Sequence, residues 1–292
     1  MRAVSQPRYG SIDVLEIGDR PVPEVDPGRV LVRVQRAALN PLDWHFMTGL
    51  PWLLRLVEGL RRPKQAVRGV DLAGVVVAVG DAVDGVAVGD SVFGGGPGAF
   101  ADYASCDPDR LAPLPDGMTF AEAAALPVAA VTALQGLRDH GGVGPGTSVL
   151  VNGAAGGVGT YAVQIAKQLG ADVTAVCSGR NVDMVRALGA DDVVDYTTAD
   201  VLDLDRQFDV ILDNVGNRSL GDVRRLLADE GVLVMVSGPK HNRLLGPVGR
   251  VVLAKLRFLA GRQRAVTFTA KETRDELLVL KQLVESGQLR SE

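Results

Sequence analysis

The stretch from Val151 to Gly170, VNGAAGGVGTYAVQIAKQLG, decides how the fold is interpreted. A short apolar strand leads into a loop with four glycines, and the loop leads into an amphipathic helix. In a dinucleotide-binding turn, glycines let the backbone approach a pyrophosphate and let the helix pack against the strand. The first free N–H groups of the helix attract the anion. We therefore predict that the pyrophosphate contacts Ala155, Gly156, Gly157 and Val158. The alternative is a glycine-rich turn that holds no ligand.

The glycine spacing fits the fingerprint G-x-G-x-x-G with one departure. Ala154 takes the first glycine position, whereas Gly156 and Gly159 take the second and third. Alanine at the first position still allows a tight turn. The context of the motif, a strand before it and a helix after it, favours the ligand-binding interpretation.

Strands alternate with helices from residue 119 onward, which predicts a parallel sheet with helices on both faces. The alternation gives a doubly wound α/β domain with a six-stranded sheet. The expected strands are 148–152, 173–177, 193–195, 210–213, 231–237 and 265–269, and the expected helices are 158–169, 181–188, 220–227 and 273–286.

The first 118 residues instead have the pattern of short strands broken by Gly, Pro and Asp, as in VDLAGVVVAVG and GDSVFGGG. They predict a compact β-barrel. We expect three segments: a barrel domain at 1–118, a dinucleotide-binding domain at 119–269, and a return to the first domain at 270–292.

Composition excludes several classes of protein. A net charge of −4 and 4% aromatic residues argue against nucleic acid as a partner. The chain has no uninterrupted apolar window long enough to span a membrane, and its N-terminus does not resemble a signal peptide. Cys106 and Cys177 are too few for a disulfide framework, which indicates a reducing compartment and predicts a cytoplasmic protein.

The end of the second parallel strand indicates which nicotinamide cofactor is used. NAD sites place Asp or Glu there to bind the ribose 2′-hydroxyl, but this chain has Ser178, Gly179 and Arg180. A guanidinium and a small hydroxyl suit a 2′-phosphate, so we predict NADPH, bound by Ser178 and Arg180. The alternative is that Arg180 is an ordinary surface residue.

Further candidates follow from the rule that ligands bind at the carboxyl ends of parallel strands. Tyr196 follows the third strand, where an adenine can stack, and Asn214 follows the fourth. Val236, Ser237 and Gly238 follow the fifth. Ordinary loop composition is the alternative for each of them.

These motifs together resemble the medium-chain dehydrogenase/reductase superfamily, in its zinc-independent quinone oxidoreductase branch, close to the reticulon-interacting-protein-like members. The resemblance covers nearly the whole chain. It implies a GroES-like catalytic domain, an NADP(H)-binding Rossmann domain, a cleft between them for quinones or α,β-unsaturated carbonyls, and a homodimer. The matching stretches are ALNPLDW, GVDLAGVVVAVG, GDSVFGGG, AALPVAAVTALQGL, VLVNGAAGGVGTYAVQIAKQLGADVTAVCS, LGADDVVDY and FDVILDNVGN.

Zinc-dependent relatives need a Cys and a His in the first domain, a Gly-His-Glu segment and a four-cysteine lobe. Here NPLDWH and GVD stand in the two ligand regions, so we predict no metal and interpret Asp43 and His45 as loop residues. Asn40 is the candidate polar group near the nicotinamide or the substrate, by resemblance and because its amide can donate. Its alternative role is to cap a turn before Pro41. No residue stands out as a general acid.

The main functional hypothesis is an NADPH-dependent reductase of quinones or activated alkenes. The other hypothesis is a nucleotide-sensing or partner-binding protein on the same fold.

Two features of the sequence have no assigned role. The first is the segment 240–264, which carries seven Lys/Arg and no acid. It is interpreted either as a basic, apolar lip over the cleft that contacts a substrate or an anionic membrane, or as a solvated helix that packs one face on the domain. The chain also ends some tens of residues before its resembling relatives, which suggests truncation and leaves the substrate pocket and one sheet edge in question.

Overall fold

The computed structural model describes residues 1–237, 248–259 and 261–292. The chain forms two compact units. The first contains Met1–Val131 together with Lys271–Glu292, and the second contains Thr132–Ala270. The sequence suggested a boundary at 118/119, before the helix α3 (Phe120–Ala124), whereas the observed division falls inside α4 (Pro127–Gln135). The reason is that α3 packs onto strands β3 and β4 of the first unit, with Ala123 and Ala124 buried.

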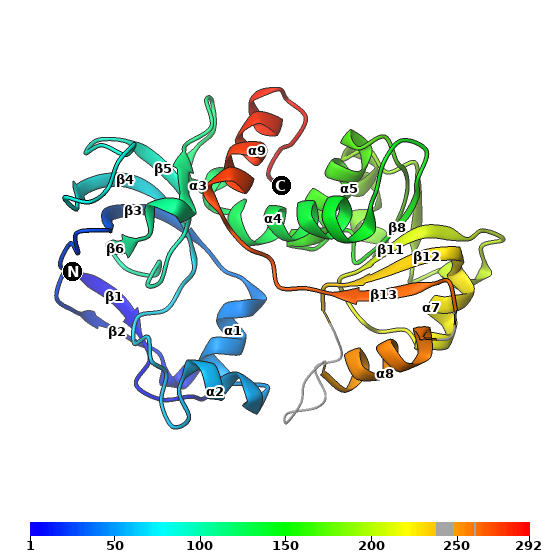
Figure 1. The fold of residues 1–292 in the computed structure, drawn as a ribbon, viewed down its shortest axis with the longest axis horizontal. Coiled ribbons are helices and arrows are strands. Elements are labelled where there is room, and N and C mark those ends of the chain that lie inside the picture. Colours follow the sequence, from blue (N-terminus) through cyan, green and yellow to red (C-terminus); the bar gives the residue numbers. More distant parts are fainter. Residues whose placement is uncertain (238–247, 260) are drawn as a thin grey trace. The chain divides into compact units, whose positions relative to one another are not determined.

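The second unit has a six-stranded, wholly parallel sheet, which confirms the predicted doubly wound fold (Figure 1). The strand order is β10-β9-β8-β11-β12-β13, so the winding direction reverses between β8 and β11. A ligand crevice in such sheets lies at this point, outside the carboxyl ends of the strands. The strands are β8 (Ser148–Asn152), β9 (Asp172–Cys177), β10 (Asp192–Asp195), β11 (Phe208–Asp213), β12 (Leu227–Met235) and β13 (Arg264–Thr267).

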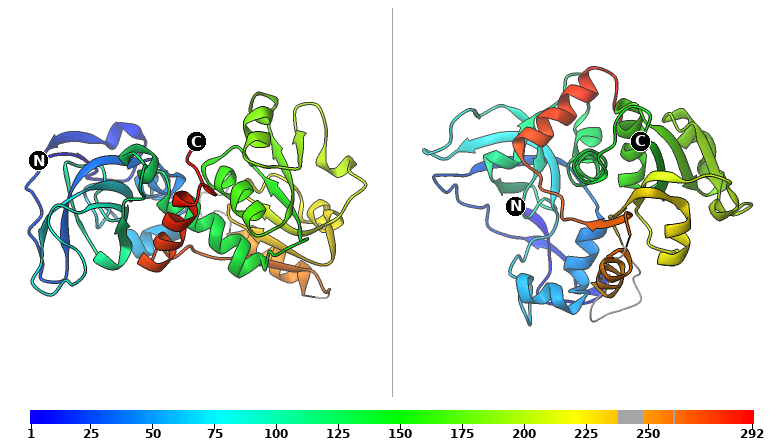
Figure 2. Two further views of the ribbon diagram at one scale, coloured as in Figure 1. Left: turned by 90° about the horizontal axis from the view of Figure 1, so that it is seen from above. Right: turned by 45° about the vertical axis from the view of Figure 1, so that its right-hand side comes forward.

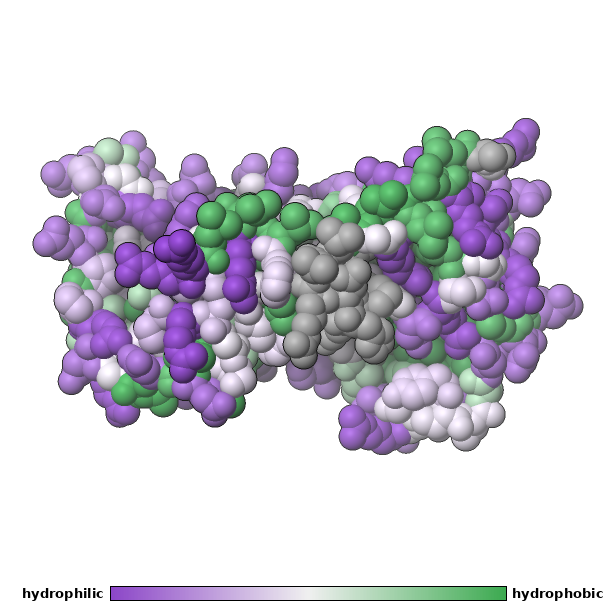
Figure 3. All heavy atoms as spheres, turned by 90° about the horizontal axis from the view of Figure 1, so that it is seen from below, coloured by the Kyte–Doolittle hydropathy of each residue, from purple (hydrophilic) through white to green (hydrophobic). Residues whose placement is uncertain are grey.

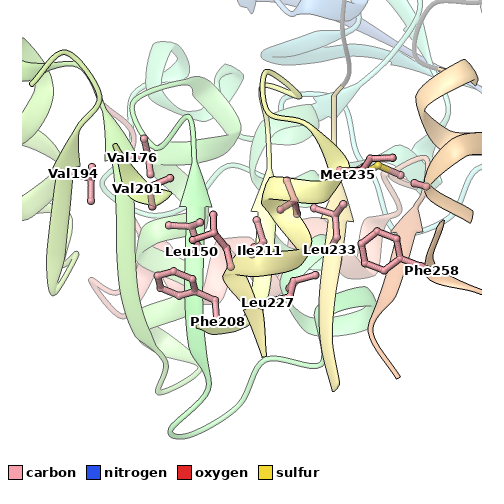
Figure 4. Packing of buried hydrophobic residues seen from close by; sticks show 14 residues of the cluster. Leu150, Val176, Val194, Val201, Phe208, Ile211, Leu227, Leu233, Met235 and Phe258 are labelled. Carbon is pink, nitrogen blue, oxygen red and sulfur yellow. The ribbon is translucent and has the colours of Figure 1, made fainter. Parts of the chain in front are cut away.

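Helices cover both faces of this sheet, as Figures 1 and 2 show, with α5 on one face and α7 and α8 on the other. A cluster of fourteen buried residues fills the face under α7 and α8, and Figure 4 shows its side chains extending from the strands toward these helices. Phe208 and Leu233 are fully buried there. The helical segments are η4 (Gly136–Gly141), α5 (Gly157–Gln168), η5 (Gly179–Asn181), α6 (Val182–Ala187), η6 (Val201–Asp203), α7 (Leu220–Leu226) and α8 (Val248–Phe258).

The fifth strand differs from the sequence prediction of 231–237. β12 begins at Leu227, directly after α7, because this buried leucine pairs with Phe208 of β11. The strand ends at Met235, so Val236 and Ser237 lie just beyond it. Their N–H groups still bond the carbonyl of Asp213, at 3.1 and 3.4 Å.

The first unit has a five-stranded antiparallel sheet in the order β6-β3-β4-β5-β7 and a two-stranded sheet, β1-β2. This is the GroES-like part of the predicted fold, and Val30, Leu72, Cys106 and Leu111 are fully buried in its core. The strands are β1 (Arg2–Ser5), β2 (Glu16–Asp19), β3 (Val30–Ala38), β4 (Asp71–Val79), β5 (Ser91–Gly95), β6 (Tyr103–Cys106) and β7 (Leu111–Pro113).

Short helices fill the connections of the first unit. Thr119 and Glu122 cap α3 reciprocally, with the Glu122 carboxylate accepting from Thr119 N at 2.8 Å. The chain returns to this unit as α9 (Arg274–Glu285), whose Leu277 and Leu280 are fully buried. The remaining helical segments are η1 (Ile12–Val14), α1 (Pro41–Thr48), η2 (Trp52–Leu54), α2 (Arg55–Glu58) and η3 (Pro108–Arg110).

Candidate functional site

The turn between β8 and α5 is fixed to the neighbouring strand. The N–H groups of Gly153 and Ala154 both bond the Val176 carbonyl at the end of β9, at 3.1 and 3.0 Å. Gly153 has φ +79°, a conformation that glycine adopts readily. Ala154 is fully buried, so an alanine fits at the first fingerprint position.

The two remaining fingerprint glycines have different surroundings. A Cβ on Gly159 would lie 2.2 Å from the Gly153 carbonyl oxygen and 2.7 Å from the Ala154 Cα, so this glycine permits close packing of helix and turn. A Cβ on Gly156 would meet only the Gly153 oxygen, at 3.5 Å. Gly156 therefore leaves open space above the helix N-terminus.

This open space faces backbone donors. Gly156 caps α5 from an extended conformation, and the N–H groups of Gly157, Val158 and Gly159 have no acceptor within the helix. Gly156 and Gly157 are exposed, and Ala155 and Val158 are half-buried. The turn thus offers an accessible set of N–H donors at the positive end of a twelve-residue helix, an arrangement that fits a pyrophosphate.

At the end of β9, Ser178 is half-buried and Arg180 is exposed. Ser178 accepts a hydrogen bond from the Asn181 amide at 3.1 Å. The exposed Tyr196 follows β10, and its N–H bonds the Cys177 carbonyl at 3.0 Å. The pairing of β9 with β10 therefore brings Ser178 and Tyr196 to the same edge of the sheet.

An acid also lies at this edge, which the sequence analysis missed because it belongs to the next strand. A Cβ on Gly179 would be 2.6 Å from Asp195 Oδ2. Asp195 Oδ1 accepts from both the N–H and the hydroxyl of Thr197, at 3.0 and 2.7 Å. These bonds, with one from the Gly179 N–H, lower the pKa of Asp195. The carboxylate is ionised and orders the turn that carries Tyr196.

The carboxyl ends of β8 and β11 are joined by a polar network around the buried Asp213. Its Oδ1 accepts from the Asn152 amide at 2.8 Å and from the Gly216 N–H at 2.9 Å. The Asn152 amide also donates to Asn217 Oδ1 at 3.1 Å. The sequence signal for this network is a polar residue at the last position of each buried strand, Asn152 in β8 and Asp213 in β11.

Asn214, a predicted cofactor contact, follows this network. Its N–H bonds the Asn152 carbonyl at 3.2 Å. Both polar atoms of its side-chain amide are buried and have no hydrogen-bond partner among the described residues. Unpaired buried amides are costly, and a polar ligand at the switch point could accept from and donate to this side chain.

The basic segment is described from Val248 onward, in α8. Arg250 bonds Asp213 Oδ2 at 3.3 Å and the Arg218 carbonyl at 2.6 Å, so it anchors α8 to the end of β11. Ala254 and Phe258 are buried, whereas Leu253 and Leu256 are exposed. Val236 and Ser237 are half-buried beyond β12, and Gly238 lies outside the described residues.

In the first unit, the candidate Asn40 lies between β3 and α1. Its Nδ2 donates to Asp71 Oδ2 at 2.9 Å, and its backbone N–H donates to Asp43 Oδ2 at 2.8 Å. Asn40 therefore caps α1, whose first residue is Pro41. Asn40 is half-buried and has the capping role that the sequence offered as the alternative, and its place near a nicotinamide or substrate stays a prediction.

Asp71 was not identified from the sequence as a site residue. It is fully buried at the start of β4, and its Oδ2 also accepts from the Val128 N–H at 3.1 Å. Its Oδ1 has no partner among the described residues. Burial, and after it the nearby charge of Glu272, holds the pKa of Asp71 well above its ordinary value. The Asn40 side chain thus donates a hydrogen bond to a carboxyl group whose neutral form is favoured by burial.

The described residues contain no group of three or more His, Cys, Asp or Glu that could hold a metal ion. His45 Nδ1 lies 2.7 Å from the Leu50 carbonyl oxygen. Both cysteines are free and buried, and burial raises the pKa of Cys106 to about 12. Zinc independence stays a prediction from the residues.

Among the described helices, none is long and apolar enough to cross a membrane.

Two family models match the chain: residues 26–116 match the alcohol dehydrogenase GroES-like domain, and residues 157–271 match the zinc-binding dehydrogenase family.

The chain is 37% identical to a 2-methylene-furan-3-one reductase of Solanum lycopersicum over 82% of its own length, and 36% identical to a chloroplastic NADPH-dependent alkenal/one oxidoreductase of Arabidopsis thaliana over 85%. It spans 62% and 63% of these two proteins. The solved structure of the quinone oxidoreductase from Coxiella burnetii is 32% identical, with a TM-score of 0.84 over 99% of this chain and 89% of that one. The chain therefore belongs to the medium-chain dehydrogenase/reductase superfamily, in its quinone oxidoreductase branch.

Proposed function

We propose that this protein is a zinc-independent reductase that uses NADPH to reduce quinones or α,β-unsaturated carbonyl compounds. The observation that carries the proposal is the β8–α5 turn at the switch point of the sheet, where Gly156 leaves open space before the free N–H groups of α5. The names of the relatives, an alkenal/one oxidoreductase and a quinone oxidoreductase, support the acceptor class.

The chain's residues have distinct tasks in this proposal. Ala155, Gly156, Gly157 and Val158 hold the pyrophosphate, and Tyr196 stacks on the adenine. Asn214 binds the nicotinamide half through its side-chain amide, which has no partner among the described residues, and Val236 and Ser237 lie at the same edge of the sheet. When bound, NADPH supplies the hydride, while the protein supplies orientation and electrostatics.

The preference for NADPH over NADH rests on Ser178 and Arg180. Arg180 is exposed just after β9, and no side chain in the described part of the chain forms an ion pair with its guanidinium. The negative charge of Asp195 at the same edge repels a phosphate, but its oxygens already accept hydrogen bonds from Thr197 and Gly179. Arg180 is therefore the residue that selects the phosphate.

Asn40 is the proposed polar group at the acceptor. One hydrogen of its Nδ2 is committed to Asp71, which fixes the amide and leaves its second hydrogen to donate to a carbonyl oxygen. Such a donor stabilises the negative charge that develops on that oxygen as hydride is added. The protein is proposed to act as a homodimer, as the family resemblance implies, and in the cytoplasm, as the two free cysteines suggest.

Titration with both cofactors tests the cofactor assignment. Arg180→Ala is expected to weaken NADPH binding by about 1–3 kcal/mol, the range for a charged hydrogen bond, and to leave NADH nearly unchanged. Arg36→Ala, an exposed arginine of the first unit, is the matched control. Equal loss of both cofactors in Arg180→Ala would contradict the assignment.

A panel of quinones and enals with NADPH tests the activity. Oxidation of NADPH by at least one acceptor, with kcat reduced in Asn40→Ala, supports the reductase. Tight NADPH binding without oxidation by any acceptor would instead favour the nucleotide-sensing or partner-binding hypothesis.

A further inference from the structure

Large apolar side chains project from the first unit around α2. Trp52, Leu53, Leu56, Val57 and Leu60 have exposed fractions of 55, 41, 66, 67 and 68%. We call these five residues the α2 patch. Figure 3 views the face on which α2 lies in Figure 1, and hydrophobic side chains gather on that face. Exposed apolar side chains are ordinary when scattered, but a contiguous group marks an interaction site.

The backbone beneath the α2 patch is held by polar bonds on its inner side. The Tyr9 hydroxyl donates to the Gly59 carbonyl at 2.7 Å, and Arg55 donates to the carbonyls of Gly49 and Thr48 at 3.0 and 3.2 Å. The Arg55 guanidinium also lies over the Tyr9 ring, 4.5 Å from its centroid. The segment thus turns its polar groups inward and its apolar groups outward, the reverse of an ordinary surface loop.

Charge complements this apolar surface. Residues 44–70 contain five Lys/Arg and a single acid, Glu58, for a formal charge of +4. The whole chain carries −4, so the remainder carries −8. Arg61, Arg62 and Lys64 are exposed directly after the α2 patch. Residues 44–70 are therefore one of two basic segments of a chain with a negative net charge, the other being residues 240–264, and three exposed cations of residues 44–70 lie beside the α2 patch.

We propose that the α2 patch docks on the surface of an anionic lipid bilayer. Its Trp and Leu side chains enter the boundary between headgroups and acyl chains, while Arg61, Arg62 and Lys64 meet lipid phosphates. Amphipathic surface segments bind by this combination of buried apolar area and attraction to anionic lipid. A second copy of the chain is disfavoured as the occupant, because two such faces would bring like charges together.

The tryptophans give a direct readout of docking. The chain has two, Trp44 and Trp52, so Trp44→Phe leaves Trp52 as the reporter. With vesicles of phosphatidylcholine and phosphatidylserine, its emission is expected to shift to the blue and to be quenched by brominated acyl chains. With phosphatidylcholine alone the shift is expected to be absent, and added salt is expected to reverse it.

Surface variants separate the apolar and basic contributions in a vesicle flotation assay. Leu56→Glu/Val57→Glu is expected to abolish binding to the anionic vesicles. Arg61→Glu/Arg62→Glu is expected to weaken it by about 30-fold or more, from the loss of two basic residues near the surface. The matched control is Ile17→Glu/Val88→Glu, which alters two side chains of the first unit that are 70 and 65% exposed and is expected to bind like wild type.

The outcomes are distinct. Failure of the wild type to bind anionic vesicles, or equal loss in the Ile17/Val88 control, overturns the proposal. If wild type does not bind and Leu56→Glu/Val57→Glu dissociates an oligomer in sedimentation, the α2 patch is a self-association interface and the lipid proposal fails. Circular dichroism and thermal unfolding of each variant report the fold of the protein separately, so the result does not depend on the proposed NADPH binding or reductase activity.

Discussion

Replacing Asp71 with asparagine tests whether Asn40 rests on a neutral carboxyl. The side chain is fully buried, and its Oδ2 accepts from Asn40 Nδ2 at 2.9 Å and Val128 N at 3.1 Å. The carbonyl oxygen of an asparagine can accept the same two bonds. Asp71→Asn therefore keeps both hydrogen bonds and removes only the ability to ionise.

The magnitude follows from linkage. Because burial raises the pKa of Asp71 in the fold, the unfolded chain releases this proton at lower pH than the folded protein. The neutral carboxyl's contribution to stability is complete below the unfolded pKa, about 3.9, and is lost as pH rises through the folded pKa. The loss approaches about 1.4 kcal/mol per pH unit within this window. Asp71→Asn lacks this loss, so its stability relative to wild type should rise with pH.

Urea unfolding of wild type and Asp71→Asn between about pH 4.5 and pH 8 measures the difference in their stability. This difference should change by at most about 1.4 kcal/mol per pH unit. Asp71→Leu is the companion variant: it removes the oxygen that accepts from the Asn40 amide and the Val128 N–H, and the loss of a buried acceptor costs about 1–3 kcal/mol. It should also lower kcat, whereas Asp71→Asn should retain it. A constant stability difference between wild type and Asp71→Asn across this range would refute the neutral carboxyl. Equal kcat in wild type, Asp71→Asn and Asp71→Leu would refute the idea that Asp71 positions the Asn40 side chain for the reaction.

Three further predictions concern the second unit. Gly156→Ala should keep the melting temperature but weaken NADPH binding, because its Cβ has room in the protein but fills the proposed pyrophosphate space. Gly159→Ala should lower both the melting temperature and the NADPH affinity. Calorimetry and NADPH titration distinguish the two variants, and an unchanged affinity in Gly156→Ala would place the pyrophosphate elsewhere. Asp195→Asn should strengthen NADPH binding severalfold without changing NADH, because a negative charge beside Gly179 is removed; equal gains for both cofactors would count against this. Arg250→Met should cost about 3–5 kcal/mol in thermal unfolding, because it leaves Asp213 buried without its cation, and a cost near that of an exposed-arginine variant would show the pair to be dispensable.

The doubly wound sheet was predictable because each parallel strand is a buried apolar run followed by a turn and a helix. The predicted 148–152 coincides with β8, and the other predicted strands overlap the observed ones. The start of β12 at Leu227 was not predictable from local pattern, since α7 runs into the strand without a turn residue. Pairing of Leu227 with Phe208, nineteen positions earlier, decides it.

The site was predictable only in part, for the same reason. The glycine turn is local, so its residues and their spacing can be found in the sequence. Gly179 follows β9, whereas Asp195 is the last residue of β10. The sequence showed that no acid follows β9, but not that the fold places an acid of β10 beside Gly179. Asn40 and Asp71 are likewise 31 residues apart and meet only through the fold.

The glycine turn and the carboxyl beneath Asn40 illustrate two kinds of functional residue. A turn that binds phosphate acts through backbone N–H groups, and sequence reveals it because glycine is needed where a side chain would block the ligand. Asp71 acts through a neighbour, and its sequence signal is only an acid at the start of an apolar strand. That signal becomes informative once the strand is known to be buried, because an acid at a fully buried position must be neutral or paired. Asp71 has no cation partner among the described residues, and its Oδ2 accepts hydrogen bonds from a side-chain amide and a helix N–H. A buried acid in a predicted core strand, with no basic residue in reach, is therefore a reason to look for the polar side chain that it positions.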